Sequence, residues 1–273
     1  MPIKVAAIQM CSGPDREANL SAADALIAEA AARDATLISL PENFSFLGRP
    51  EDKLKEAEAF ESSQVLEFLR GQARRHAVHL IGGSIPLRSE DPARASNSCL
   101  ALNPQGEIVA RYDKMHLFDV SIDVVNTFRE SDHVKPGNET VVFATGDLTI
   151  GLSICFDIRF PELYRSLSHA GADLVFVPSA FTVPTGKAHW EVLLRARAIE
   201  NLCYVAAPAQ IGQHIPGRTS YGKSMIVDPW GTVLGVAPDR PCVVTSDIDI
   251  GHLHRVRTQL PALEKRRNDV FRG

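Results

Sequence analysis

The chain has 273 residues, a formal net charge of −4, and 45% hydrophobic and 23% charged residues. This composition can fill the core of a globular protein, and the lack of a basic excess argues against a nucleic-acid partner. No apolar run is long enough to cross a membrane, so we expect no membrane partner. The five cysteines are irregularly spaced and form no Cys-x-x-Cys pair, which argues against a disulfide framework or zinc site and favours a reducing cytoplasm.

Strand and helix patterns alternate along the first half of the chain. Strands are predicted at 5–10, 36–40 and 78–84, and helices at 15–32 and 62–76. The first strand pattern begins almost at residue 1, so we expect no signal peptide. A hairpin over 97–102 and 107–112 is predicted because the Asn-Pro-Gln-Gly segment at 103–106 is typical of a type I turn. Residues 113–140 are predicted to form a long loop, and such a loop is usually functional.

The second half repeats this alternation. Strands are predicted at 141–143, 148–154, 173–177, 203–207 and 243–248, a hairpin at 224–227 and 232–236, and helices from Pro161 and over 190–201. The tail to residue 273 is basic and helical, with an interruption at Pro261.

Residues 35–44 resemble residues 172–181 position by position in residue class. The two predicted hairpins, each with an x-Pro-x-Gly turn, also follow in the same order. We therefore expect two similar β-α-β halves within one domain over 1–273, with a C-terminal tail from about residue 251. Each half would form one mixed sheet with helices on one face, and the sheets would pack as a four-layer α-β-β-α sandwich, an α/β fold.

Three predicted strands end in a polar and potentially reactive residue: Glu42, Lys114 and Cys155. Active sites lie beyond the carboxyl ends of parallel strands, so these residues are expected to meet. Cys155 stands at a strand-to-helix corner, where a helix dipole is expected to lower the thiol pKa and backbone N–H groups could stabilise an oxyanion.

These residues suffice for acyl transfer. Cys155 would attack a carbonyl carbon, and Glu42, with a pKa raised by burial, would pass the thiol proton to the leaving amine. Lys114 and the backbone N–H of Phe156 would stabilise the negative oxygen, and water activated by Glu42 would then release the acid.

Simpler interpretations of the same residues stay open. A lone cysteine at a strand end is often a small buried hydrophobic residue, and a Glu or Lys after a strand is often a solvated loop charge. A Cys–His hydrolase would instead use a histidine as its base, and His116, His169 and His189 are candidates. His252 and His254 beside Asp249 could suggest a metal site, but surface positions without a further ligand are the better interpretation, so no metal is predicted.

Three motifs resemble the signatures of the nitrilase (carbon–nitrogen hydrolase) superfamily: Leu-Pro-Glu at 40–42, Tyr-Asp-Lys-Met-His-Leu-Phe-Asp at 112–119, and Ser-Ile-Cys-Phe-Asp-Ile-Arg-Phe-Pro-Glu-Leu at 153–163. Their order also matches, and the resemblance extends from residue 5 to about 267. It implies the four-layer fold, a Glu42–Lys114–Cys155 triad, no metal and no organic cofactor. It also implies a supporting carboxylate, Glu130, that orients Lys114 and helps to position substrate; an exposed loop charge is the alternative.

The residues after the cysteine indicate a branch. Nitrile-cleaving members typically have Trp-Glu there, whereas this chain has Phe156-Asp157, which resembles an amidase. Residues 188–200 and 220–231 resemble the Nit branch, which holds two activities. Hydrolysis of deaminated glutathione to 2-oxoglutarate and Cys-Gly is the closer match; ω-amidase activity on α-ketoglutaramate is the alternative, as is a non-catalytic interaction protein on the same fold. Lys223 replaces the usual His and leaves the fine specificity open.

Either substrate is a small amide that carries an α-keto acid group, whose carboxylate needs a cation. Arg159 is the first candidate, because a guanidinium can bind a carboxylate through two parallel hydrogen bonds. A salt bridge within the fold, for example with Glu162, is the alternative. Phe181 and Thr185 lie in the predicted loop after residue 177 and are expected to line the pocket. The resemblance also implies a homodimer or larger homo-oligomer, formed through helices that flank the site.

Overall fold

The computed structural model describes residues 3–121, 127–267 and 270, and two large sheets lie at its centre. The strands of the first sheet are, in spatial order, β18 (Cys242–Ile248), β1 (Ile3–Gln9), β2 (Leu37–Ser39), β3 (His79–Ile81), β5 (Ala95–Leu102) and β4 (Ile85–Arg88), with β6 (Ile108–Asp113) and β9 (Val134–Lys135) also paired to β5. The strands of the second sheet are β10 (Val142–Thr145), β11 (Leu148–Leu152), β12 (Leu174–Phe176), β13 (Tyr204–Ala207), β16 (Met225–Val227) and β17 (Val233–Val236).

The two sheets have the same internal plan. β1, β2 and β3 are parallel to one another, as are β11, β12 and β13, and the flanking hairpin strands are antiparallel. Both sheets are therefore mixed, and the order β18-β1-β2-β3-β5-β6 of the first corresponds to β10-β11-β12-β13-β16-β17 of the second, whereas β4 and β9 have no counterpart. This correspondence is what the echo between residues 35–44 and 172–181 predicts.

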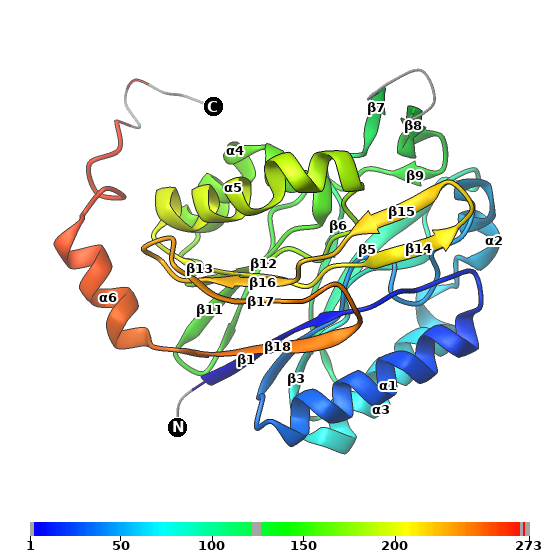
Figure 1. Ribbon diagram of the computed structural model, residues 1–273, viewed down its shortest axis with the longest axis horizontal. Helices are drawn as coiled ribbons and strands as arrows, with labels where there is room; N and C mark the ends of the chain where they lie inside the picture. Colours follow the sequence, from blue (N-terminus) through cyan, green and yellow to red (C-terminus); the bar gives the residue numbers. More distant parts are fainter. Residues whose placement is uncertain (1–2, 122–126, 268–269, 271–273) are drawn as a thin grey trace.

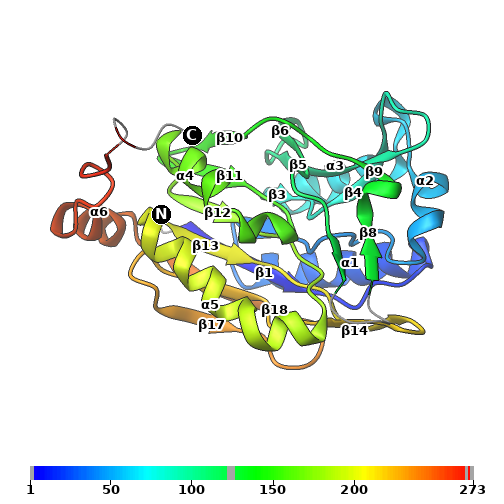
Figure 2. The same ribbon diagram turned by 90° about the horizontal axis from the view of Figure 1, so that it is seen from above.

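Helices cover the outer face of each sheet (Figures 1 and 2). The helices α1 (Arg16–Ala32) and α3 (Gln64–His76) lie on the first sheet, and α4 (Pro161–His169) and α5 (Val183–Asn201) lie on the second. Side chains alternate along β1: Val5 and Ala7 belong to the core cluster shared with the second sheet, whereas Ala6 and Ile8 pack with residues of α1 and α3. The predicted four-layer α-β-β-α sandwich is confirmed.

The predicted helix at 190–201 is longer than expected, since α5 begins at Val183. Pro184 lies in its first turn, where a missing N–H costs no hydrogen bond, so the proline and Gly186 do not mark a loop there. The chain after the lysine motif is also more regular than predicted. It contains β7 (Asp119–Ser121), which pairs with β8 (Thr127–Arg129), and a 3-10 turn at Glu130–Asp132; residues 122–126 of the predicted loop lie outside the described residues.

Several further elements were not predicted. The strand pattern at 78–84 ends early, because Gly83 adopts a φ of +55° and β4 follows it. A 3-10 turn at Pro50–Asp52 leads into the short helix α2 (Lys53–Glu56), and another 3-10 turn spans Phe60–Ser62. The strands β14 (Ile211–Ile215) and β15 (Arg218–Tyr221) form a hairpin at the edge of the molecule (Figure 1).

The C-terminal segment contains α6 (Ile250–Gln259), whose first turn is capped by the Asp249 carboxylate through the His252 N–H at 2.9 Å. The helix ends before Pro261, as predicted. No helix among the described residues is both long enough and apolar enough to cross a membrane.

Candidate active site

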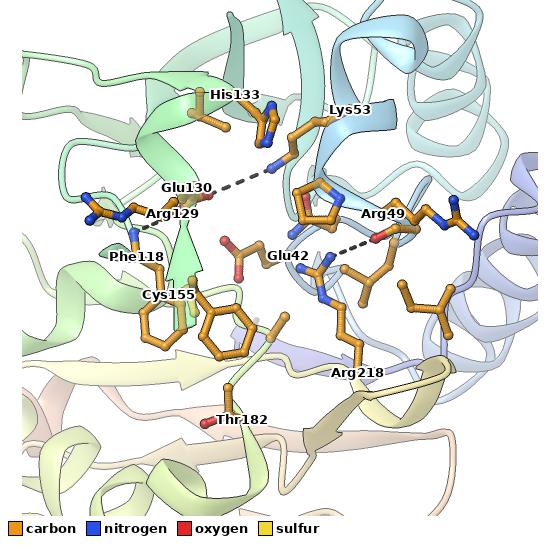
Figure 3. A pocket seen from close by; sticks show the side chains of 18 of the residues that line it. Glu42, Arg49, Lys53, Phe118, Arg129, Glu130, His133, Cys155, Thr182 and Arg218 are labelled. Atoms are coloured by element: carbon orange, nitrogen blue, oxygen red, sulfur yellow. Dashed lines mark hydrogen bonds and ion pairs between the residues drawn. The ribbon is translucent and has the colours of Figure 1, made fainter. Parts of the chain in front are cut away.

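The three strand-end residues meet at one cavity of about 460 Å³ (Figure 3). Glu42 follows β2, Lys114 directly follows β6, and Cys155 follows β11. All three line the cavity although they come from different strands and both sheets. The expectation that they lie together is therefore confirmed by their positions.

The turn that carries Glu42 is held against the loop after β3. The backbone N–H of Asn43 donates to Ser84 Oγ at 3.0 Å, and Asn43 itself has a φ of +56°. At Gly83 a Cβ atom would lie 2.1 Å from the Pro41 carbonyl oxygen, so only glycine permits this approach. The close contact fixes the backbone on both sides of Glu42.

Cys155 lies on a strained turn, with a φ of +50° that side-chain-bearing residues rarely adopt. Its N–H donates to the Pro178 carbonyl at 2.9 Å. The Glu42 carboxylate acts on the thiol to raise its pKa, and the Ala180 N–H acts to lower it. The turn is therefore anchored to the segment after β12 while the sulfur faces the cavity.

The Lys114 ammonium is buried between carboxylates. Its Nζ donates to Glu42 Oε1 at 2.9 Å and to Glu130 Oε2 at 2.8 Å. Asn97 Nδ2 donates to both carboxylates, at 3.1 Å to Glu42 and 3.3 Å to Glu130. Burial opposes the charged form of Lys114, but Glu130 and Glu42 together raise its pKa well above the ordinary value.

Glu130 is tied into this set from a second direction. The Phe118 N–H donates to Glu130 Oε2 at 2.8 Å. Burial opposes ionisation of this carboxyl, yet the charges of Lys114 and Lys53 hold its pKa well below its usual range. Glu130 thus contacts Lys114, as predicted, and the alternative of an exposed loop charge is wrong because the side chain is 15% exposed.

Asp157 connects the cysteine turn to the lysine motif. Its fully buried carboxylate accepts hydrogen bonds from Tyr112 Oη at 2.7 Å, the Ile154 N–H at 2.8 Å and the His116 N–H at 3.0 Å, and it contacts His116 Nδ1 at 2.7 Å. Tyr112 belongs to the first sheet and Asp157 follows the second, so this one carboxylate joins the two sides of the site.

The expected lowering of the Cys155 pKa is wrong. Burial and the neighbouring Glu42 carboxylate raise the thiol pKa well above its ordinary value, although Lys114 and the Ala180 N–H act in the opposite direction. The expected dipole is also small, because only a five-residue 3-10 turn, Cys155–Arg159, follows the thiol before α4 begins. The sulfur therefore rests as a thiol and needs a base.

Two of the three predicted substrate-binding residues line the cavity, and the third does not. Phe181 and Thr185 line the cavity, but Thr185 lies in the first turn of α5 instead of a loop. Arg159 is not among the lining residues. Its guanidinium lies over the rings of Phe156 and Phe181, at 5.8 and 5.5 Å from their centres, and 3.3 Å from His189 Nδ1. No ion pair joins Arg159 to Glu162 among the described residues.

Other polar residues of the site were not predicted from the sequence. Asn97 lies in the wholly buried strand β5, and a run of polar residues in such a strand is a signal that could have been used. Lys53 and Arg218 also line the cavity, from α2 and β15. Neither of these two short elements has a pattern that points to a site.

The histidines proposed as alternative bases do not line the cavity. His116 is stacked on Phe160 with ring centres 3.7 Å apart, His169 is exposed at the end of α4, and His189 faces Arg159. No group of three metal-ligating side chains lies within the described ranges 3–121 and 127–267. Asp249, which was considered beside His252, caps α6.

A comparison with protein-family models matches residues 4–258 to the family described as carbon-nitrogen hydrolase. This chain belongs to the carbon–nitrogen hydrolase family. It is 45% identical over 268 residues to the deaminated glutathione amidase of Synechocystis sp. (strain PCC 6803 / GT-S), an alignment that covers 97% of this chain and 98% of that protein. The predicted family is thus confirmed.

Two solved structures extend the comparison. Saccharomyces cerevisiae Nit3, described as a member of branch 10 of the nitrilase superfamily, superposes with a TM-score of 0.88 at 31% identity and covers 97% of this chain and 96% of its own. A glutamate-to-glutamine mutant of the amidase from Nesterenkonia sp. AN1 superposes with a TM-score of 0.84 at 27% identity, covering 98% and 95%. That structure shows covalent addition of the acetamide moiety of fluoroacetamide at the active-site cysteine.

Proposed function

We propose that this carbon–nitrogen hydrolase is an amidase that converts deaminated glutathione to 2-oxoglutarate and Cys-Gly through an acyl-enzyme on Cys155. The observation that carries the proposal is that Cys155, Glu42 and Lys114 line one cavity, in which Lys114 Nζ donates to Glu42 Oε1 at 2.9 Å. Similarity to the Synechocystis enzyme over nearly the whole chain supports this choice of substrate.

In the first half-reaction Glu42 accepts the thiol proton while the Cys155 sulfur attacks the amide carbon. The raised thiol pKa makes this base necessary. Lys114 and the Phe156 N–H are the proposed donors to the oxyanion. When the C–N bond breaks, Glu42 returns its proton to the leaving nitrogen, so that Cys-Gly departs as the amine and the acyl group stays on sulfur.

In the second half-reaction a water molecule takes the place of the amine. Glu42 accepts a proton from the water as the water oxygen attacks the thioester carbon. The C–S bond then breaks to release 2-oxoglutarate, and Glu42 returns the proton to the departing sulfur, which restores the thiol and the carboxylate. Glu130 is the proposed positioning residue for Lys114, because it holds the ammonium at 2.8 Å and favours its charged form.

The α-keto acid end is proposed to lie on the thiol side of the cavity, beside Phe181 and Thr185. Arg159 is proposed to act on this end without touching it, because its guanidinium lies over the Phe156 and Phe181 rings. The two aromatic side chains thus lie between this cation and the cavity, and they leave Arg159 to act on the substrate through the field of its charge or after a rotation of its side chain.

We also propose a cytoplasmic homodimer. Large exposed apolar side chains gather on α5 and the β16–β17 hairpin, namely Val192, Ile199, Trp230 and Val236. Such a patch is typical of a protein–protein interface. Sedimentation should give a dimer for the natural protein and a monomer for Val192→Asp; a monomeric natural protein would contradict the proposal.

The substrate is tested by comparing hydrolysis of deaminated glutathione, α-ketoglutaramate and a simple nitrile, with Cys155→Ala as the blank. We expect the highest kcat/KM with deaminated glutathione and none with the nitrile. Preference for α-ketoglutaramate would replace the proposed substrate by that of an ω-amidase. A folded protein with no activity and an unreactive Cys155 would support the non-catalytic alternative.

A further inference from the structure

The side of the cavity that lies across from the thiol carries two cations that the proposed chemistry does not use. Lys53 is the first residue of α2 and Arg218 is the first residue of β15, and both side chains line the cavity (Figure 3). They reach it from segments far apart in the chain, and their charged groups both point inward in Figure 3.

These cations are poorly paired. Among the described residues the nearest anion to Lys53 Nζ is Glu130 Oε1 at 3.8 Å, which is too far for a hydrogen bond. Glu130 is already bound to Lys114 and the Phe118 N–H. The Arg218 side chain donates to the Gly48 carbonyl at 2.8 Å, and the described residues offer it no carboxylate within ion-pair distance. Its guanidinium has further N–H groups that can donate.

Arg218 lies on the Glu42 side of the thiol. Glu42 appears between Cys155 and Arg218 in Figure 3. The negative groups that act on Arg218 are, from strongest to weakest, Glu42, Glu130 and Cys155, whereas Arg159 is influenced by Cys155. Burial lowers the pKa of Arg218, so a bound anion would relieve the cost of its desolvation. Arg218 thus lines the cavity on the Glu42 side of the thiol (Figure 3), whereas Arg159 lies over the rings of Phe156 and Phe181.

We propose that Lys53 and Arg218 form an anion subsite that binds the carboxylate of the leaving amine. This inference rests on the proposed function, in which the leaving amine is Cys-Gly and the anion is its C-terminal carboxylate. The leaving nitrogen receives its proton from Glu42, so the amine must lie on the Glu42 side of the sulfur, where Arg218 is found. A guanidinium and an ammonium together suit a carboxylate, which can accept from both.

The subsite is held in place before substrate arrives. His214 in β14 contacts the Ser12 carbonyl through Nδ1 at 2.7 Å and Ser220 Oγ through Nε2 at 2.8 Å, which holds the hairpin against the segment after β1. The hydrogen bond from Arg218 to Gly48 ties the hairpin to the segment that precedes α2. Such preorganisation reduces the entropy lost on binding.

The experiment compares three amides that share one acyl group: deaminated glutathione, its C-terminal carboxamide, and α-ketoglutaramate, which releases ammonia. In Arg218→Gln we expect kcat/KM to fall about 10- to 100-fold with deaminated glutathione and less than about threefold with the two amides that lack the C-terminal carboxylate. Lys53→Met should give the same pattern with a smaller loss, and Arg240→Gln, an exposed arginine away from the cavity, is the charge-matched control.

Equal losses with all three amides would overturn the inference, since Arg218 would then act on the fold, on Glu42 or on the acyl group that the three amides share. Failure of the natural protein to hydrolyse any of the amides would instead refute the proposed function itself.

The anion subsite can also be tested on the natural protein, so that the result does not depend on whether a variant folds. The product Cys-Gly should inhibit hydrolysis of α-ketoglutaramate about tenfold more strongly than cysteinylglycinamide, because only Cys-Gly offers the carboxylate. Equal inhibition by the two compounds would overturn the inference.

Discussion

Two walls of the cavity differ in how completely their charges are paired. On one wall Lys114 is buried between Glu42 and Glu130, and Asn97 donates to both carboxylates. On the other wall Lys53 is 3.8 Å from its nearest anion and Arg218 donates to a backbone carbonyl. In the saturated wall each charged group has a partner that fixes its position, as oriented proton transfer requires, whereas the unsaturated wall keeps donors available for a ligand.

Among the substitutions in the saturated wall, Lys114→Met is expected to have the largest effect on activity and stability. The change leaves Glu42 and Glu130 buried without their shared cation, so we expect loss of activity and a decrease of about 3–5 kcal/mol in the free energy of unfolding. Urea denaturation measures the decrease. A variant as stable as the natural protein would show that the carboxylates do not depend on this charge.

Glu42→Gln should keep the fold but lower kcat by about 100- to 10,000-fold, because the thiol loses its base. Glu42 is also one cause of the raised thiol pKa, so its removal should lower the pKa of Cys155. The pH dependence of alkylation by iodoacetamide checks this directly. An unchanged alkylation profile would mean that the two side chains are not coupled.

Protonation of His214 is expected to destabilise the hairpin that carries Arg218, and this can be measured as a loss of stability at low pH. Burial lowers the pKa of His214 to about 4, with a smaller contribution from Arg218, whereas the unfolded chain has the ordinary value of 6.5. The stabilising contribution is thus complete above pH 6.5 and is lost as the pH falls toward 4, by on the order of 3 kcal/mol. Urea denaturation of His214→Gln should show a shallower decline over this range; equal slopes would contradict the assignment.

Glu130→Gln removes a charge from the saturated wall but leaves a hydrogen-bonding group. We expect kcat to fall about 10- to 100-fold, and the alkaline limb of the pH–rate profile to move to lower pH, because Glu130 helps to raise the pKa of Lys114. Glu139→Gln, an exposed change in the same part of the chain, is the control. An unmoved alkaline limb would show that Glu130 does not act through Lys114.

The saturated wall was predictable because its residues follow strong strand patterns. Glu42 and Cys155 follow apolar strands and Lys114 follows the second strand of a predicted hairpin, and the motifs around them are specific to a family that the comparison confirms. The wall with Lys53 and Arg218 was not predictable, because α2 has four residues and β15 has four, too few for a periodic signal. The prediction of a lowered thiol pKa was wrong for another reason. The pKa depends on burial, and burial depends on packing that no local sequence pattern contains.

The Asp157 carboxylate has a consequence for how the halves of the molecule can move. It accepts hydrogen bonds from Tyr112 and His116 on the first-sheet side while it also holds the Ile154 N–H beside the thiol. If one sheet slid past the other by a single residue, these donors would lose their hydrogen-bond partner in an interior without water. The hydrogen bonds of Asp157 therefore fix the distance between Cys155 and Lys114 and, at the same time, the alignment of the two sheets.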